Sequence, residues 1–316
     1  MPLAGDVYRS IYSRRISSKS RGFPSLLNLE TCNICNIRCT MCPNSAMTRP
    51  KSTMSMSPYQ KIIDDAARIG IKEVSLLGWG EPLLDKLIFD RIEYAKWRGL
   101  TVRFNSNGTL LLDNDNIASL VKSNLDCIYL SIDGVTKETY EKIRLGAKFE
   151  DVVNGFGRLI EEKKRQNATT PEVRISCCVQ VGNYTEIAHK REEYYELFRD
   201  ADLLVFVPVL KLQNEGEHLP TDLDFKTPVK RRGHIYPCHN LFDVFNVFVD
   251  GSVVLCCLDY DAQVRLGDLN VQTITEVWES TQYENIRRLH LQGNGGKMKM
   301  CSNCSEFIKS SFSWWF

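Results

Sequence analysis

The chain has 316 residues, of which 43% are hydrophobic and 25% charged, and its formal net charge is +1. This length suffices for one large core and a smaller module, and the charge balance implies no polyanion, so no nucleic acid partner is expected. No apolar stretch approaches the roughly 20 residues that cross a bilayer, so no transmembrane segment is expected. Twelve cysteines fall well below the roughly 8–10% density of disulfide scaffolds, which favours a reducing, cytoplasmic location.

Residues 1–25 form a basic segment that contains several serines and a single acid, Asp6. Transit peptides share this composition. We expect instead a short helix and an extended arm that cover the bottom of the domain that follows. The apolar run of residues 26–30 then predicts a first strand.

Three cysteines, Cys35, Cys39 and Cys42, follow this strand directly. Thiolates hold iron–sulfur clusters, usually four to a cluster, so a three-cysteine loop predicts a four-iron cluster with one iron left for an outside ligand. Two alternatives stay open. One is a structural zinc site, although its two facing cysteine knuckles would need a longer separation than that between Cys35 and Cys39. The other is a ferredoxin-type cluster, which could take Cys32 as its fourth thiolate.

The spacing Cys35-x3-Cys39-x2-Cys42, with Asn36 and Pro43 beside it, resembles the radical S-adenosylmethionine (radical SAM) superfamily. The resemblance implies that the amine and carboxylate of S-adenosylmethionine chelate the open iron of a [4Fe-4S] cluster. It also implies that one electron, from a flavodoxin- or ferredoxin-type reductant, splits the sulfonium to a 5′-deoxyadenosyl radical.

Residues 26–209 alternate apolar runs with helix-period stretches, the pattern of repeated βαβ units. Six strands are predicted, at residues 26–30, 73–77, 101–105, 127–132, 173–180 and 203–209. Ser57 and Pro58 predict the N-cap and the first residue of the first helix. Six units are too few for an eight-stranded barrel, so we expect an α/β fold with an open, partial (β/α)6 TIM-like barrel. Its active site should lie at the carboxyl ends of the strands.

A glycine-rich motif, Gly78-Trp79-Gly80-Glu81-Pro82, follows the second predicted strand. Its glycines allow the backbone to approach a ligand closely. It resembles the family's Gly-Gly-Glu-Pro motif, with Trp79 as the departure from the commoner form, and the resemblance implies that it binds the methionyl amino group. By itself, a glycine-rich turn after a strand is also ordinary loop chemistry.

Two polar motifs close the next strands: Asn105 and Asn107 follow the third, and Ser131 and Asp133 follow the fourth. The resemblance implies that they surround the adenosyl group, with Ser131 or Asp133 contacting the ribose hydroxyls. It further implies that Arg144 pairs with the cofactor carboxylate, which suits the planar guanidinium, although Arg144 could equally be a solvated helix residue.

Four cysteines near the C-terminus, Cys238, Cys256, Cys301 and Cys304, supply the thiolates for a second metal site. Asp250-Gly251 predicts a two-residue hairpin that returns Cys256 toward Cys238. This region resembles the SPASM extension in its truncated, twitch form, which implies one auxiliary [4Fe-4S] cluster and no second one, because no cysteine follows Cys304. A zinc site from the same four residues is the alternative.

Cys257 follows a predicted cluster ligand directly. The resemblance implies an acid–base group or a hydrogen-atom donor at this position, and a small buried hydrophobic residue is the alternative. Asp259, Asp243 and His239 are further candidate bases, of which Asp259 is assigned with Cys257 to the catalytic set.

The predicted organisation has five parts. These are the arm (1–25), the barrel (26–209), a connector (210–237), the auxiliary cluster domain (238–308) and an aromatic tail (309–316). The connector carries Lys226, Lys230, Arg231 and Arg232, which suggest an acidic or phosphorylated substrate or else a solvated loop.

The expected activity is reductive cleavage of S-adenosylmethionine, followed by hydrogen abstraction from a substrate C–H bond. The favoured outcome is epimerisation or dehydrogenation of a polar small molecule of the sugar or aminocyclitol type. A peptide-modifying maturase or epimerase and an iron–sulfur electron-transfer protein are the alternatives, and cleavage of S-adenosylmethionine separates the last from the others.

Overall fold

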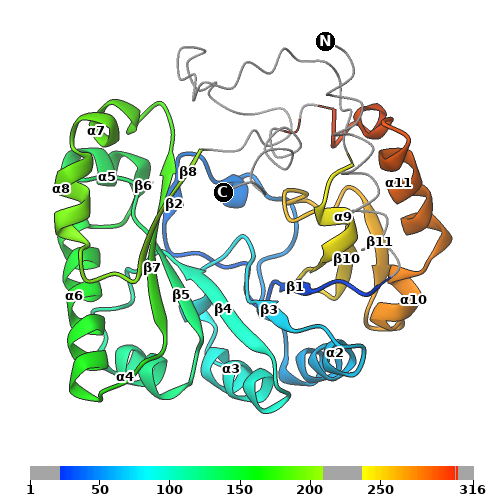
Figure 1. Ribbon diagram of the computed structural model, residues 1–316, viewed down its shortest axis with the longest axis horizontal. Helices are drawn as coiled ribbons and strands as arrows, with labels where there is room; N and C mark the ends of the chain where they lie inside the picture. The colour runs from blue at the N-terminus through cyan, green and yellow to red at the C-terminus, as the bar shows by residue number, and fades with distance from the viewer. Residues whose placement is uncertain (1–21, 209–236, 303, 305–316) are drawn as a thin grey trace, which may run out of the picture.

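A single curved sheet organises the chain (Figure 1). The computed structural model describes residues 22–208, 237–302 and 304. The predicted arm (1–25) except residues 22–25, the basic residues of the connector and the aromatic tail lie outside the described residues. No helix in the described ranges is both long and apolar enough to span a membrane.

Nine strands form the main sheet in the order β11-β10-β9-β1-β3-β4-β5-β7-β8. Their bounds are β1 Leu26–Leu29, β3 Glu73–Ser75, β4 Thr101–Ser106, β5 Cys127–Ser131, β7 Glu172–Val179, β8 Leu203–Pro208, β9 Val244–Val247, β10 Ser252–Val254 and β11 Arg265–Asp268. The six strands predicted between residues 26 and 209 are all present and are mutually parallel. The predicted open, partial barrel is confirmed.

Helices cover the outer face of this sheet, as Figure 1 shows. They are α2 Met56–Arg68, α3 Ile88–Trp97, α4 Asn114–Lys122, α5 Lys137–Ile143, α6 Phe149–Arg165, α7 Tyr184–His189, α8 Arg191–Leu197, α10 Ile274–Trp278 and α11 Thr281–Leu291. The short helix α9 Asn240–Asp243 directly precedes β9. The strand residues that face these helices are fully buried, whereas alternate residues are half-buried, as in the pattern of β7. The half-buried set lines the barrel interior because side chains alternate along a strand.

The first helix begins two residues earlier than predicted. Ser55 is the N-cap of α2 and Pro58 lies in the first turn, whereas Ser57 was predicted to cap the helix. The difference has a simple cause: the amide of every first-turn residue lacks an intrahelical acceptor, so proline is tolerated throughout that turn.

The C-terminal strands extend the barrel sheet. β9 pairs in parallel with β1 over Leu26 to Leu29, and β10 and β11 follow antiparallel. The hairpin between β9 and β10 is present, but its loop has three residues, because Phe248 N donates to Ser252 O (2.9 Å) and Gly251 N to Phe248 O (2.8 Å). Gly251, at φ +84°, supplies the left-handed residue of such a loop. The loop is therefore one residue longer than the two-residue turn that was predicted.

Candidate active site and cluster sites

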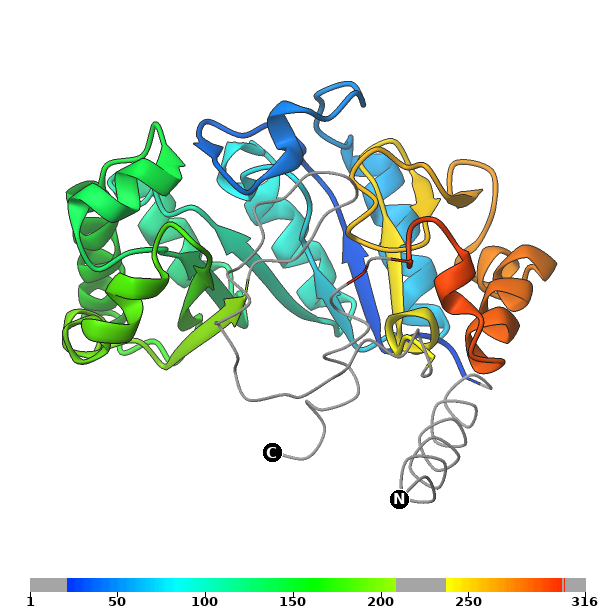
Figure 2. The same cartoon turned by 90° about the horizontal axis from the view of Figure 1, so that it is seen from above.

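The cysteine loop lies at the carboxyl ends of the parallel strands, together with the turn after β9 (Figure 2). Cys39 belongs to β2 (Arg38–Cys39), which pairs antiparallel with β6 (Arg144–Leu145), and Cys42 N donates to Cys39 O at 3.1 Å. Burial raises the pKa of the Cys39 thiol to about 12, the charge of Arg144 opposes this, and Cys42 and Cys35 add to it. The three thiols are therefore close enough to act on one another.

Polar donors face two of these thiols. Asn107 Nδ2 lies 3.9 Å from Cys35 Sγ, and Arg144 Nη1 lies 3.7 Å from Cys39 Sγ. Such donors stabilise thiolates and tune the cluster that the thiolates hold. The three cysteines and their surroundings thus fit an iron–sulfur cluster, whose binding would release the thiol protons.

Cys32 is placed differently from the three loop cysteines. Its thiol is buried and donates to the carbonyl of Ile34 at 3.6 Å. Burial raises its pKa to about 11, and the charges that add to this are those of Asp85, Glu81 and Glu30. These contacts favour a core role for Cys32 over the fourth-ligand role of the ferredoxin alternative.

The glycine-rich loop Gly78–Pro82 lies against the cysteine loop. Glu81 N donates to Ile34 O at 2.8 Å. A Cβ on Gly80 would come within 2.5 Å of Cys32 O and 2.7 Å of Ile34 O. Glycine is therefore required because two backbones touch at this point, and the close approach brings the glycine-rich loop to the cysteines.

A glycine-to-alanine pair measures this contact. We expect Gly80→Ala to lower the free energy of unfolding by about 1–3 kcal/mol, because backbone atoms cannot yield to the added methyl. Gly157 in α6 has open space around its Cβ position, so Gly157→Ala should stabilise by about 1 kcal/mol. Denaturant unfolding of both anaerobically prepared variants, with iron content measured in parallel, checks the prediction. Equal stability of the two variants would contradict it.

Glu81 is fully buried and anchors the glycine-rich loop. Its carboxylate accepts from Asn107 N (2.7 Å), Ser106 Oγ (2.8 Å) and Leu83 N (3.1 Å). Burial raises its pKa, and these hydrogen bonds oppose the shift. Glu81, predicted to bind the cofactor, is thus engaged with the end of β4, and this favours a positioning role behind the backbone of the loop.

The two polar motifs lie next to each other at the strand ends. Asn105 and Ser131 are half-buried on the inward faces of β4 and β5. Asn107 Nδ2 donates to Asn36 Oδ1 at 2.9 Å, which ties the end of β4 to the cysteine loop. The end of β4 therefore lies beside the cysteine loop, and the contacts of both motifs with the adenosyl group stay a prediction.

Arg144 is buried and belongs to β6, so its alternative assignment as a solvated helix residue is wrong. It makes a two-nitrogen ion pair with Asp133 Oδ2, at 2.8 Å from Nε and 2.7 Å from Nη2. The other carboxylate oxygen, Asp133 Oδ1, accepts from Cys178 N at 2.7 Å. Both residues lie beside Cys39, and Asp133 fixes the guanidinium there.

The four C-terminal cysteines come from three segments. Cys238 precedes α9, Cys256 follows β10, and Cys301 and Cys304 follow the turn η3 (Gly295–Lys297). Burial raises the pKa of Cys238, and the charges of Cys256, Cys304 and Cys301 add to the shift. The other three cysteines therefore lie close enough to Cys238 to raise its pKa, and their shared role as cluster ligands stays a prediction. In the described ranges, no three Cys, His, Asp or Glu side chains are grouped to hold a single metal ion.

The candidate catalytic residues divide into two kinds. Cys257 is half-buried, and its hydrogen bond with Cys256, together with burial, holds the pKa of the Cys256 thiol well above its usual range. Asp259 is buried, and its two oxygens accept from Gln263 N (2.8 Å) and Val264 N (2.7 Å). Asp259 thus stabilises its own loop, and this geometry favours a structural role over that of a base.

Asp243 lies at the opposite edge of the sheet from the cysteine loop. It precedes β9, and its carboxylate accepts from Ser25 Oγ at 2.8 Å, just before β1. Since β9 is parallel to β1, this position is the amino end of both strands. Asp243 is therefore far from the cysteine loop at the carboxyl ends, and this position argues against its predicted role as a base in the reaction.

An open parallel barrel with a three-cysteine loop at its carboxyl edge, followed by a four-cysteine domain, defines a radical SAM enzyme with an auxiliary cluster. Residues 29–171 match the family model of the Radical SAM superfamily, and residues 238–305 match SPASM, an iron–sulfur cluster-binding domain. The chain belongs to the radical SAM superfamily. These two domains imply a [4Fe-4S] cluster that binds S-adenosylmethionine and an auxiliary iron–sulfur cluster.

Three similar proteins illustrate the breadth of the family. The tungsten-containing aldehyde ferredoxin oxidoreductase cofactor-modifying protein of Pyrococcus furiosus is 27% identical, over 90% of this chain and 90% of its own. The S-adenosyl-L-methionine-dependent 2-deoxy-scyllo-inosamine dehydrogenase of Niallia circulans is 23% identical, over 89% of this chain and 92% of its own. The structure of native anSMEcpe with bound AdoMet has a TM-score of 0.65 at 19% identity, over 91% of each chain.

Sequence reasoning missed the polar side chains of the barrel interior. Asn28 on β1 donates to Asn246 on β9 at 2.9 Å, and Arg174 on β7 donates to Tyr129 on β5. The signal was available in part, because Asn28 interrupts an apolar strand at an alternating position. The partner strand of Asn28 could not be read from the sequence.

Proposed function

We propose that this radical SAM enzyme abstracts a hydrogen atom from a C–H bond of a polar small molecule bound inside the barrel, and epimerises or dehydrogenates it. The polar interior is the observation that carries the proposal. Inward positions of neighbouring strands carry amides and hydroxyls, namely Asn28, Asn105, Tyr129, Ser131, Ser176 and Asn246.

The interior charges are already paired with one another. Arg103 lies 2.5 Å from Glu73, and Arg174 lies 2.6 Å from Glu172. A barrel interior with paired charges and many uncharged hydrogen-bonding groups suits a polyhydroxylated or aminated ring better than a strongly charged substrate. The dehydrogenase of Niallia circulans, similar over 89% of this chain, acts on such a ring by its name.

Each part of the site has a defined task in this proposal. Cys35, Cys39 and Cys42 would hold the cluster, and the backbone of Gly78–Glu81 would receive the methionyl group. When bound, S-adenosylmethionine supplies the radical that takes the substrate hydrogen. The barrel wall orients one C–H bond and excludes water, which is the protein's share in cofactor chemistry of this kind. A flavodoxin- or ferredoxin-type protein is the proposed electron donor.

Anaerobic reconstitution tests the proposal. The reduced protein should form 5′-deoxyadenosine, and a polyhydroxylated or aminocyclitol substrate should stimulate its formation. Solvent deuterium in the recovered substrate would indicate epimerisation, and a product two hydrogens lighter would indicate dehydrogenation. Stimulation by peptides alone would favour the maturase alternative, which the solved complexes of peptide-bound neighbours support by fold. Absence of S-adenosylmethionine cleavage would favour the electron-transfer alternative.

A further inference from the structure

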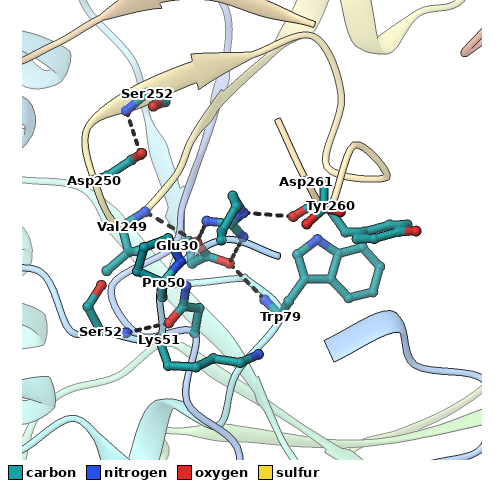
Figure 3. A network of polar contacts seen from close by, with 12 residues as sticks. Glu30, Pro50, Lys51, Ser52, Trp79, Val249, Asp250, Ser252, Tyr260 and Asp261 are labelled. Carbon is teal, nitrogen blue, oxygen red and sulfur yellow. Dashed lines mark hydrogen bonds and ion pairs between the residues drawn. The ribbon is translucent and has the colours of Figure 1, made fainter. Parts of the chain in front are cut away.

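Glu30 forms a buried ion pair with Arg49, and Figure 3 shows Glu30 within a network of polar contacts. Arg49 Nη1 donates to Glu30 Oε2 at 2.8 Å and Arg49 Nη2 to Glu30 Oε1 at 3.0 Å, and the side chains are 5% and 0% exposed. Glu30 follows β1, and Arg49 follows the three cysteines. The pair therefore closes the base of the loop that carries Cys35, Cys39 and Cys42.

The same pair contacts the glycine-rich loop. Trp79 N donates to Glu30 Oε1 at 3.1 Å (Figure 3). A Cβ on Gly78 would come within 2.3 Å of Glu30 Cγ, so glycine at this position leaves room for the glutamate. The position of the Glu30 carboxylate thus fixes the backbone of residues 78 and 79.

The pair also contacts the C-terminal domain. Val249 N donates to Glu30 Oε2 at 3.2 Å, and Arg49 Nε donates to the carbonyl of Tyr260 at 2.7 Å. The guanidinium lies 3.7 Å from the centre of the Phe248 ring. The hairpin turn that precedes Cys256 is therefore joined, through two side chains, to both loops of the cofactor site.

We propose that the Glu30–Arg49 pair is a positioning device that couples the auxiliary cluster domain to the S-adenosylmethionine site. The C-terminal hairpin holds Arg49 and Glu30, and Glu30 in turn sets the backbone at Trp79, where the methionyl group would bind. The inference rests on the proposed function only in taking S-adenosylmethionine as the ligand of this site. Desolvation offsets most of the electrostatic gain of a buried ion pair, so the contribution that we assign to this pair is the geometry it imposes.

A double substitution tests the device without leaving one charge buried alone. We expect Glu30→Gln combined with Arg49→Met to weaken S-adenosylmethionine binding about tenfold, within the roughly 5–150-fold span of typical couplings. The change that S-adenosylmethionine produces in the EPR spectrum of the reduced cluster should shrink in the same variant. Arg49→Lys keeps the positive charge but loses the two-nitrogen contact of the guanidinium with Glu30, so it should show the same effects to a smaller degree.

A second buried pair provides the matched control. Arg91 Nε and Asp85 Oδ2 lie 2.8 Å apart, with side chains 0% and 2% exposed, and the further contacts of the pair are to Met54, Tyr59 and Leu87. Asp85→Asn combined with Arg91→Met removes an equal charge pair. It should alter S-adenosylmethionine affinity less than about twofold.

A perturbation from the C-terminal side tests the coupling itself. Phe248→Leu should weaken S-adenosylmethionine binding in the wild-type background and add nothing in the double variant, because coupled sites are non-additive. Amide exchange of residues 78–81, measured without S-adenosylmethionine, should be faster in Phe248→Leu and in the double variant, and unchanged in the control.

Two results would overturn the coupling. One is that Phe248→Leu weakens S-adenosylmethionine binding by the same factor in the wild-type protein and in the double variant. The other is unchanged amide exchange at residues 78–81 in Phe248→Leu and in the double variant. Failure of the proposed function looks different. In that case the binding and exchange results would support the coupling, while no polyhydroxylated or aminocyclitol compound would stimulate formation of 5′-deoxyadenosine by the wild-type protein.

Discussion

Replacing Cys35, Cys39 or Cys42 with alanine is expected to abolish formation of 5′-deoxyadenosine. Each thiolate would bind one iron, and loss of one leaves a second iron without a protein ligand. The three thiols lie close enough in the folded chain to raise one another's pKa, so all three are placed to share one cluster. The measurement is 5′-deoxyadenosine formed by anaerobically reconstituted, dithionite-reduced protein, with iron and sulfide determined on the same sample.

Cys32→Ser is the matched control for these variants. Cys32 lies next to the same loop, and its thiol donates to the carbonyl of Ile34, a bond that a serine hydroxyl can replace. The variant should keep its iron and its 5′-deoxyadenosine formation. If Cys32→Ser were inactive and one of the three loop variants active, the ligand assignment would be wrong and the ferredoxin-type alternative would gain support.

Local sequence patterns sufficed to predict the six barrel strands. Each is an apolar run bounded by turn residues, and consecutive βαβ units pair with their neighbours by a general rule. The place of β9 beside β1 could not be predicted, because it joins residues 218 positions apart, as the Asn28–Asn246 contact shows. Sheet order of this kind depends on tertiary packing, which no local pattern encodes.

The candidate site shows the same division. The cysteine spacings and the glycine-rich loop are local, and they lie together as predicted. The Glu30–Arg49 pair was missed, since charged residues near a motif give no sign of the partner that buries them. Asp259 was predicted as a base because it lies near the predicted auxiliary cluster in the sequence, but its two amide contacts depend on the conformation of the following loop.

Cys257→Ala is expected to leave 5′-deoxyadenosine formation intact and to halt substrate turnover, because the substrate radical would then lack its hydrogen-atom donor. In an epimerisation, the Cys257 thiol would give its hydrogen atom to the substrate carbon radical. The thiyl radical that remains would need one electron and one proton before the next cycle. Turnover is measured as solvent deuterium incorporated into the substrate per 5′-deoxyadenosine formed.

A structural role for Cys257 makes a different prediction, because Cys257 is hydrogen-bonded to Cys256, which is a predicted ligand of the auxiliary cluster. If Cys257→Ala only disturbed that cluster, iron content would fall together with turnover, and Cys257→Ser would restore both by replacing the hydrogen bond. If Cys257 donates the hydrogen atom, iron content stays at the wild-type level in both variants. Neither variant then turns over, because the O–H bond of serine is too strong to be an effective donor. Full activity of Cys257→Ala would exclude the donor role.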